Sequence, residues 1–194
     1  YRLEPVIYSF GSLEALIRSG VQGLKVHLEI DTGMHRLGFA PDDIHRLALL
    51  LREVESVIEV ASVFSHLAAS ESKDSDVFTR GQLDIFALAA KTLEDVLGKS
   101  LLKHIENTGG ILRFNDDRFS MVRLGIGLYG VDPRGGLGEI NLQPVTRMIS
   151  TISQIQRVKA GEGVGYGMYG VSDCDREIAV IAAGYADGLC RSDG

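Results

Sequence analysis

The stretch LKVHLEIDTGMHRLGF, residues 24–39, joins a mostly apolar run to a polar, glycine-containing loop. Its first part, residues 24–31, predicts a strand, because a short apolar run is typical of a strand in a buried sheet. The run ends in Asp31, Gly33 and Arg36. Strand ends that only turn the chain rarely need an arginine. We therefore expect Arg36 to lie where a ligand binds.

Around this stretch, strand-like and helix-like segments alternate as far as about residue 130. Strands are expected at 5–10, 24–31, 58–68, 101–107 and 121–130. Helices are expected between the first four, the first helix capped by Ser12, and a short turn, ILRF, before the last strand. This alternation is typical of βαβ units and a parallel sheet. After VDPRGG, the runs RMISTISQIQRVKAG and REIAVIAAGYADG alternate apolar and polar residues without a helix between them. They predict antiparallel β-structure and a domain boundary near residues 135–142.

Composition narrows the classes of function. The chain has 194 residues, 45% of them hydrophobic, which is enough for a substantial core. A net charge of −6 and the lack of a Lys/Arg run argue against nucleic acid, and no apolar run is long enough for a membrane span. Cys174 and Cys190 form no C-x-x-C pair, which favours a reducing cytoplasm, and no His/Cys spacing indicates a metal. Because the chain begins with Tyr1 and not with Met, we expect it to start inside a larger protein or to be a processed or cloned piece.

Several polar residues follow the apolar runs, where α/β sheets collect their chemistry. His66 is interpreted as a core histidine or a ligand contact, residues 107–110 as a turn or an anion-binding nest, and Tyr185 as packing or function. Arg123 lies in an apolar run, so it needs a carboxylate partner or a ligand. The segment GIGLYG, residues 125–130, matches G-x-G-x-x-G, but no helix follows it. We therefore interpret it as a glycine-lined strand end that meets a phosphate, not a dinucleotide.

The order of the motifs is more specific than any one of them. DTGMHRLGF, FSHLA, ENTGG, MVRLGIGLYG and AAGYADG follow one another over nearly the whole chain. In this order they resemble alanine racemase, a family of pyridoxal-phosphate enzymes built from a TIM barrel and a β domain. The resemblance implies the C-terminal part of a (β/α)8 barrel, about five βα units over residues 1–138, and the start of a mainly antiparallel β domain over residues 139–194.

The resemblance also implies a set of residues that bind pyridoxal 5'-phosphate. The ring of His66 packs on the pyridine ring, and Arg123 hydrogen-bonds the pyridine nitrogen, where a permanent cation keeps that nitrogen unprotonated. The phosphate is held by Asn107, Thr108, Gly125 and Ile126, the last two through their backbone. Thr108 stands where serine is more usual, and its hydroxyl preserves the chemistry.

The implied reaction interconverts L- and D-alanine by a two-base mechanism on the pyridoxal phosphate aldimine, which supplies D-alanine for cell-wall peptidoglycan. Arg36 contacts the substrate carboxylate, for which a bidentate guanidinium is suited. Tyr185 is the base or acid on one face, helped by a hydrogen-bond chain through His66 to Arg123. In the family this tyrosine reaches the active site of the partner subunit, so a cytoplasmic homodimer is implied.

Two residues depart from the family pattern, and one essential residue is missing. Glu29 stands where many members carry a carbamylated lysine, so we expect it to supply that negative charge to Arg36 without CO2; the alternative is a surface glutamate. His35 stands where glycine is common. No lysine of this chain lies in a motif like V-K-A-N-A-Y-G-H-G, so the chain alone is expected to be inactive. The rival functions are a racemase of broader specificity and a non-catalytic pyridoxal-phosphate-binding barrel protein.

Overall fold

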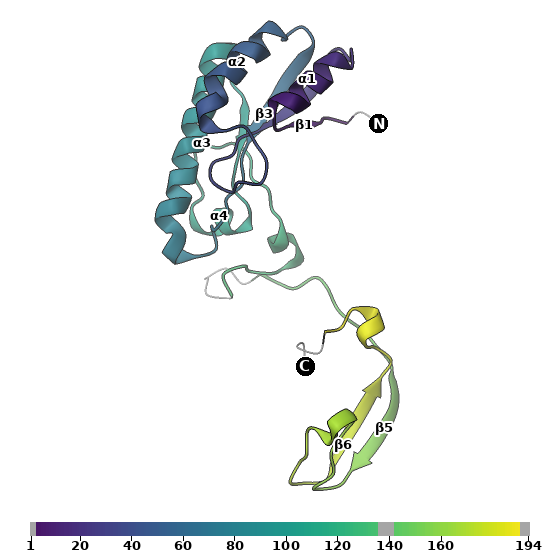
Figure 1. Cartoon of the computed structure of the whole chain (residues 1–194). Coiled ribbons are helices and arrows are strands. Elements are labelled where there is room, and N and C mark those ends of the chain that lie inside the picture. Colours follow the sequence, from purple (N-terminus) through teal and green to yellow (C-terminus); the bar gives the residue numbers. More distant parts are fainter. Residues whose placement is uncertain (1–2, 136–141, 191–194) are drawn as a thin grey trace. The chain divides into compact units, whose positions relative to one another are not determined.

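The structure is a computed structural model that describes residues 3–135 and 142–190 (Figure 1). The chain divides into two compact units, the first ending at Val145 and the second beginning at Thr146. The boundary predicted between residues 138 and 139 lies outside the described residues.

The first unit is built on a parallel sheet, as the alternation of segments predicts. Its four strands lie in the order β1-β2-β3-β4, and each pairs in parallel with its neighbour. The strands are β1 (Val6–Ile7), β2 (Leu24–Glu29), β3 (Ile58–Phe64) and β4 (Leu102–His104). Arg36, His66 and Asn107 lie in the segments that follow β2, β3 and β4, at the carboxyl edge of the sheet.

Four α-helices accompany the sheet: α1 (Phe10–Arg18), α2 (Ile44–Glu53), α3 (Asp76–Leu97) and α4 (Thr108–Arg113). The apolar faces of α2 and α3 form one core with the strands, in which Leu47, Phe86 and Leu28 are fully buried. The cap predicted for α1 is wrong by three residues. Ser9 is the N-cap, and Ser12 is its partner in a capping box, because the two side chains exchange hydrogen bonds with each other's backbone.

The two faces of β2 carry different side chains. Val26 and Leu28 belong to the helix-covered core, whereas His27 and Glu29 alternate to the opposite face. The strand register places His27 beside Ser62, and it places Glu29 beside Phe64, which pairs in turn with His104 on β4. This second face of the sheet is therefore polar, although it is largely buried.

The strand predicted at residues 121–130 is wrong. The segment makes only scattered hydrogen bonds to β4 and the residues after it, among them Met121 N–H to Lys103 O and Arg123 N–H to Glu106 O. It then forms a 3-10 turn at Ile126–Tyr129. The glycines allow this turn, and Thr108 closes it through the hydrogen bonds described below. Other 3-10 turns lie at Pro41–Asp43, Lys73–Ser75, Tyr166–Met168 and Tyr185–Asp187.

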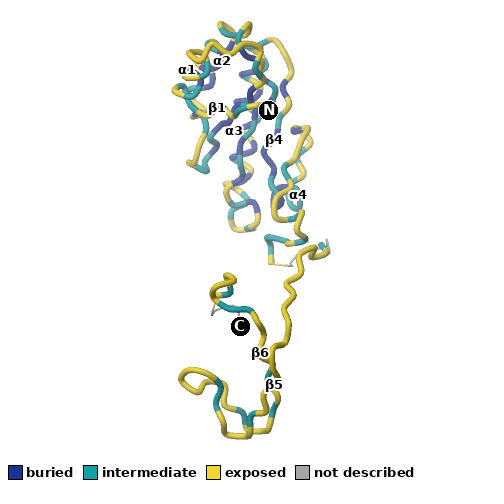
Figure 2. Tube along the Cα trace, turned by 90° about the vertical axis from the view of Figure 1, so that its right-hand side faces the viewer, coloured by how far each residue is buried: buried dark blue, intermediate teal, exposed yellow. Residues whose placement is uncertain are grey.

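The second unit is an antiparallel hairpin of β5 (Ile152–Val158) and β6 (Arg176–Ile181), as predicted. Its strands are mostly exposed, whereas the buried segments lie in the first unit (Figure 2). Ile152 and Ile155 are more than half exposed although both lie in a strand. Among the described residues, no helix is both long enough and apolar enough to cross a membrane.

Candidate functional site

A cavity of about 340 Å³ opens beyond the carboxyl ends of β3 and β4. It brings together residues from His66 to Pro133, which lie 67 positions apart in the chain. Its lining includes all six residues that the sequence assigns to the cofactor: His66, Asn107, Thr108, Arg123, Gly125 and Ile126. Ser70, Glu71, Gly109, Leu124 and Pro133 complete the wall.

Arg123 connects the cavity to the sheet. One of its terminal nitrogens donates to the Nδ1 of His104 and, at 3.1 Å, to the carbonyl oxygen of the same residue. The other donates to the carbonyl of Ser65 and lies 3.2 Å from the Nδ1 of His66. The guanidinium also stacks on the Phe64 ring at 5.1 Å from its centre. Arg123 is thus held by several contacts and needs no carboxylate partner within hydrogen-bond distance.

The two histidines that touch Arg123 are held in the neutral form. Burial lowers the pKa of His66, and the nearby charges of Arg123 and Arg36 lower it further. Burial, Arg123 and His27 lower the pKa of His104 to about 4. Because a guanidinium only donates hydrogen bonds, each histidine accepts through Nδ1 and carries its proton on Nε2.

Thr108 organises the glycine-rich turn on the other side of the cavity. Its hydroxyl oxygen accepts hydrogen bonds from the backbone N–H of Gly125 and of Gly127, both at 3.1 Å. A hydroxyl has two acceptor sites and one donor, so both acceptor sites are filled. The hydroxyl proton is left to donate to an acceptor in the cavity. The Gly125 amide, which we expected to face a phosphate, is engaged by Thr108 instead.

Asn107 lines the cavity but uses its side chain to hold the loop. Its Oδ1 accepts from Gly110 N–H at 3.0 Å, which caps α4, and from Ser70 Oγ at 2.6 Å. Its Nδ2 donates to Leu67 O at 3.1 Å. The backbone of Gly109 lies close to Ser70, because a Cβ atom on Gly109 would lie 2.6 Å from Ser70 Oγ. The loop after β4 is therefore packed closely against the loop after β3.

The loop that carries Arg36 is closed at its base. Asp31 N–H donates to Phe39 O, and Phe39 N–H donates to Glu29 O, both at 2.9 Å. Gly38 is required at this closure, since a Cβ atom would lie 2.5 Å from the Asp31 nitrogen. Arg36 is exposed near the tip; its charge adds to the lowering of the His66 pKa by burial and offsets part of the rise that burial causes in the pKa of Glu29.

In the same loop, the backbone of His35 adopts a conformation that favours glycine, the residue that the resemblance implies at this position. His35 has φ 54°, in the left-handed region that favours glycine. Its backbone N–H donates to Asp31 at 3.0 Å, and its ring Nδ1 lies 2.9 Å from the second carboxylate oxygen. Burial would raise the pKa of Asp31, but hydrogen bonds from Gly33 and His35 lower it overall. The histidine thus supports its strained backbone through Asp31.

Glu29 is not a surface residue, because only 7% of it is exposed. Burial raises the pKa of its carboxyl group, and the charges of Arg36 and Arg123 offset part of that rise. No hydrogen bond or ion pair joins Glu29 to Arg36 in the described part of the chain. Glu29 therefore acts on both arginines through space, whereas we expected it to act on Arg36 directly.

Tyr185 lies in the second unit, in a 3-10 turn, and is 72% exposed. Of the predicted chain from Tyr185 through His66 to Arg123, only the link between His66 and Arg123 lies within one unit. No lysine is among the residues that line the cavity in the described parts of the chain. Those parts also contain no group of three His, Cys, Asp or Glu residues placed to hold a metal.

Sequence reasoning missed Gln82, which belongs to α3 and is 1% exposed. Its Nε2 donates to Thr32 Oγ1 at 3.2 Å and to His66 O at 3.1 Å. Its Oε1 accepts from Ala68 N–H at 3.0 Å. Gln82 thus fastens the loops after β2 and β3 to one helix. The signal in the sequence is an amide on a face of that helix that is apolar apart from Thr79.

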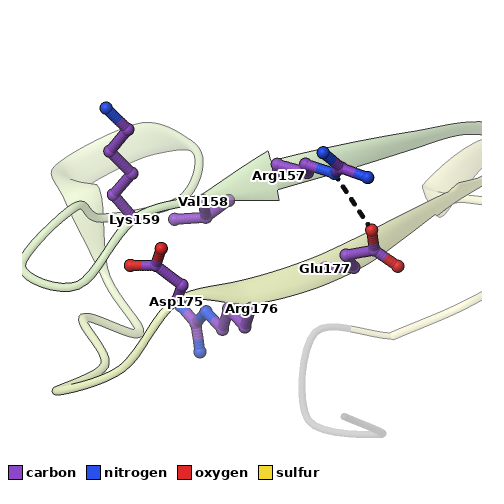
Figure 3. A pocket seen from close by; sticks show the side chains of 6 residues that line it. All are labelled: Arg157, Val158, Lys159, Asp175, Arg176 and Glu177. Atoms are coloured by element: carbon purple, nitrogen blue, oxygen red, sulfur yellow. Dashed lines mark hydrogen bonds and ion pairs between the residues drawn. The ribbon is translucent and has the colours of Figure 1, made fainter.

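A second cavity, of about 470 Å³, lies on the hairpin of the second unit (Figure 3). Its wall is made of charged side chains and Val158, and the only ion pair drawn joins Arg157 to Glu177 at 3.2 Å. Four of these six residues are exposed, Val158 and Arg176 are half-buried, and none lies at a position that the motifs single out. We therefore assign the candidate site to the smaller cavity.

The two units match the two domains of one class of enzyme. Residues 1–133 match the family model for the N-terminal domain of alanine racemase, and residues 145–193 match the model for its C-terminal domain. The parallel sheet followed by an antiparallel unit agrees with this order. The chain belongs to the alanine racemase family.

Relatives of known name extend this match over nearly the whole chain. It is 38% identical to an alanine racemase of Actinobacillus succinogenes over 98% of its length, and 35% identical to one of Cutibacterium acnes over 95%. The alignments cover 52% and 50% of those proteins, so the chain spans about half the length of these relatives.

Solved structures give the same result. The alanine racemase of Streptomyces coelicolor superposes with a TM-score of 0.82 at 28% identity, covering 98% of this chain and 52% of that one. An alanine racemase from Bartonella henselae, solved with covalently bound pyridoxal phosphate, has a TM-score of 0.76 at 27% identity. That alignment covers 98% of this chain and 52% of that structure.

Proposed function

We propose that this chain is part of a longer alanine racemase, called the complete protein below, and that its cavity binds pyridoxal 5'-phosphate. The observation that carries the proposal is the convergence of His66, Thr108 and Arg123 on one cavity together with the other three predicted cofactor residues. The family and the relative that contains the bound cofactor support it.

The donors around the cavity suit the two ends of this cofactor. A phosphate group needs hydrogen-bond donors, and on the glycine-rich side these are the Thr108 hydroxyl proton and the backbone N–H of Ile126. Arg123 also lines the cavity, and we assign it to the ring nitrogen. The bound cofactor would supply the electron-withdrawing ring that makes the Cα proton of an amino acid acidic.

The other residues of this chain bind and orient the substrate and move its proton. We assign Arg36, whose guanidinium is exposed, to the substrate carboxylate, which suits bidentate binding. Tyr185 of one subunit would take or give the Cα proton in the cavity of the other subunit. A lysine outside this chain would serve the opposite face of the substrate. We further propose that the complete protein is a cytoplasmic homodimer that makes D-alanine for the cell wall.

The test is D-alanine formation from L-alanine with added pyridoxal phosphate, measured on this chain and on the complete protein side by side. We expect activity only in the complete protein. Activity in the short chain would show that one of its own lysines holds the cofactor and that our site is wrong. If the complete protein binds the cofactor but racemises serine or lysine, a racemase of broader specificity replaces the proposal. If it binds the cofactor and racemises no amino acid, a non-catalytic carrier replaces it.

Glu29 provides a second test within the same proposal. Glu29→Gln removes the buried negative charge that lies between two arginines. We expect the complete protein to lose activity in this variant and the wild type to be indifferent to CO2. A marked CO2 requirement of the wild type would show that a carbamate, and not Glu29, supplies the charge.

A further inference from the structure

A row of hydrogen-bonded side chains crosses the polar face of the sheet and ends at Arg123. His104 Nε2 lies 3.1 Å from Ser62 Oγ, and Ser62 Oγ lies 2.6 Å from His27 Nδ1. His27 Nε2 then lies 3.0 Å from the carboxylate oxygen Oε2 of Glu4. The row thus runs from the cavity wall through β4, β3 and β2 to the residues that precede β1.

The arginine fixes the direction of every bond in this row. Arg123 only donates, so Nδ1 of His104 must accept and its proton must lie on Nε2. That proton is donated to Ser62, and the hydroxyl proton of Ser62 is therefore donated to Nδ1 of His27. His27 in turn carries its proton on Nε2, and this proton points at Glu4. Four donors in sequence lead from the Arg123 guanidinium to the Glu4 carboxylate. At every contact in the row, one donor meets one acceptor.

Ser62 and His104, in the middle of the row, are buried, so water cannot replace their hydrogen-bond partners. Ser62 is 0% and His104 5% exposed. The Phe64 ring stacks on the His104 ring at a centre-to-centre distance of 5.1 Å and an angle of 2°, which holds the imidazole in its plane. The far end is open, with 28% of the His27 side chain and 44% of the Glu4 side chain exposed. A break at Ser62 would leave the Nε2–H of His104 buried without an acceptor.

We propose that Glu4, His27 and Ser62 are positioning residues that keep His104 in the one tautomer able to accept from Arg123. Without them His104 can move its proton to Nδ1, where it would face the N–H of Arg123 and expel the guanidinium from its place. Since the same guanidinium donates to His66, the row also determines which nitrogen of His66 carries its proton. The effect on the cofactor rests on the proposed function, whereas the effect on the tautomers does not.

The first measurement is the tautomer of each histidine in the cofactor-free complete protein, read from long-range ¹H–¹⁵N correlations. In the wild type we expect His27 and His104 to be protonated only on Nε2. Ser62→Ala should give a mixture of tautomers at both residues, and Ser62→Thr, which keeps the hydroxyl, should restore the wild-type signals. Ser65→Ala is the matched control, because it removes an equally buried hydroxyl that bonds to Thr32 and not to the row.

The second measurement is the dissociation constant for pyridoxal phosphate. Ser62→Ala should weaken binding by about tenfold, as expected for one broken hydrogen bond beneath Arg123, and Ser62→Thr by less than about twofold. If Ser62→Ala does not fold, Glu4→Leu at the exposed end of the row replaces it, with His27 expected to lose its single tautomer. Unchanged tautomers in these variants would overturn the proposal.

The two proposals fail in different ways. A complete protein that binds no pyridoxal phosphate, yet shows the expected tautomers and their loss in Ser62→Ala, overturns the proposed function and leaves the row established. A complete protein that binds the cofactor equally well with and without the Ser62 hydroxyl, with unchanged tautomers, keeps the function and overturns the row.

Discussion

Thr108 shows how a single hydroxyl can shape a binding site. Its oxygen holds two backbone N–H groups of the turn at Gly125 and Gly127, and it is 3% exposed. A Cβ atom on Gly127 would lie 2.7 Å from the Thr108 methyl group, so the turn and the threonine fit each other closely. The methyl group, which serine lacks, is therefore accommodated by a glycine.

We expect Thr108→Val to weaken pyridoxal phosphate binding by the complete protein by about tenfold or more, because two accepted hydrogen bonds and one donor are lost at nearly constant volume. Thr108→Ser retains all three and should bind within about threefold of the wild type. Fluorescence or absorbance titration measures both constants. Equal loss in the two variants would show that packing of the methyl group, and not the hydroxyl, matters.

His104 makes the stability of the first unit depend on pH. Its pKa falls from 6.5 in the unfolded chain to about 4 in the folded one, mainly through burial. Between these values the unfolded state binds the proton more readily, so the free energy of unfolding falls as the pH falls from about 7 to about 4. The loss expected from this group is about 3 kcal/mol. Urea denaturation of the wild type and of His104→Gln should show curves that converge at acid pH; parallel curves would contradict the assignment.

The sequence singled out six residues that line one cavity, but not the contacts that they make there. Arg123 was identified because a guanidinium in an apolar run requires a hydrogen-bonding partner or a ligand. Asn107 was expected to bind a phosphate, whereas its amide caps α4 and joins two loops. The partners of His104 and Gln82 are set by strand register and helix packing, which no local pattern encodes. Such contacts between distant residues become visible only in the folded chain.

At the scale of elements, α3 does more than cover the sheet. Through Gln82 it holds the backbone at His66 and Ala68 and the side chain of Thr32. The apolar face of the helix buries Phe86, Ala90 and Leu93, so the helix is itself well fixed. The loops after β2 and β3 are therefore positioned by a rigid helix and not only by their own turns.

Gln82→Glu tests this role, because a carboxylate of the same shape cannot donate to His66 O or Thr32 Oγ1. We expect the free energy of unfolding to fall by about 2–4 kcal/mol, since a charge is also buried near two acceptors. The control is Gln154→Glu on the exposed strand β5, where a change below about 0.5 kcal/mol is expected. Comparable effects at both sites would show that Gln82 does not fasten the loops.

Most elements agreed with their patterns, and the last predicted strand of the first unit did not. Helices α2 and α3 follow from apolar periodicity, and strands β2, β3, β5 and β6 lie within the runs that predicted them. The segment 121–130 has the composition of a strand, but its hydrogen bonds to the chain around β4 are too few and Thr108 draws its glycines into a turn. Tertiary contacts of this kind override local preference.

At the scale of the whole molecule, the sheet has open sides. Within the described residues β1 pairs only with β2, and β4 pairs only with β3. Unpaired edges favour association with another chain. The chain spans about half the length of its relatives, so we propose that other strands of the complete protein continue this sheet into a closed barrel.

The most direct test of the account is a crystal structure of the complete protein with pyridoxal phosphate. We predict the phosphate at the Thr108 hydroxyl and the backbone of Ile126, the ring against His66, and the ring nitrogen beside Arg123. A cofactor bound outside this cavity, or with its phosphate at Arg123, would contradict the central claim that these residues form the cofactor site.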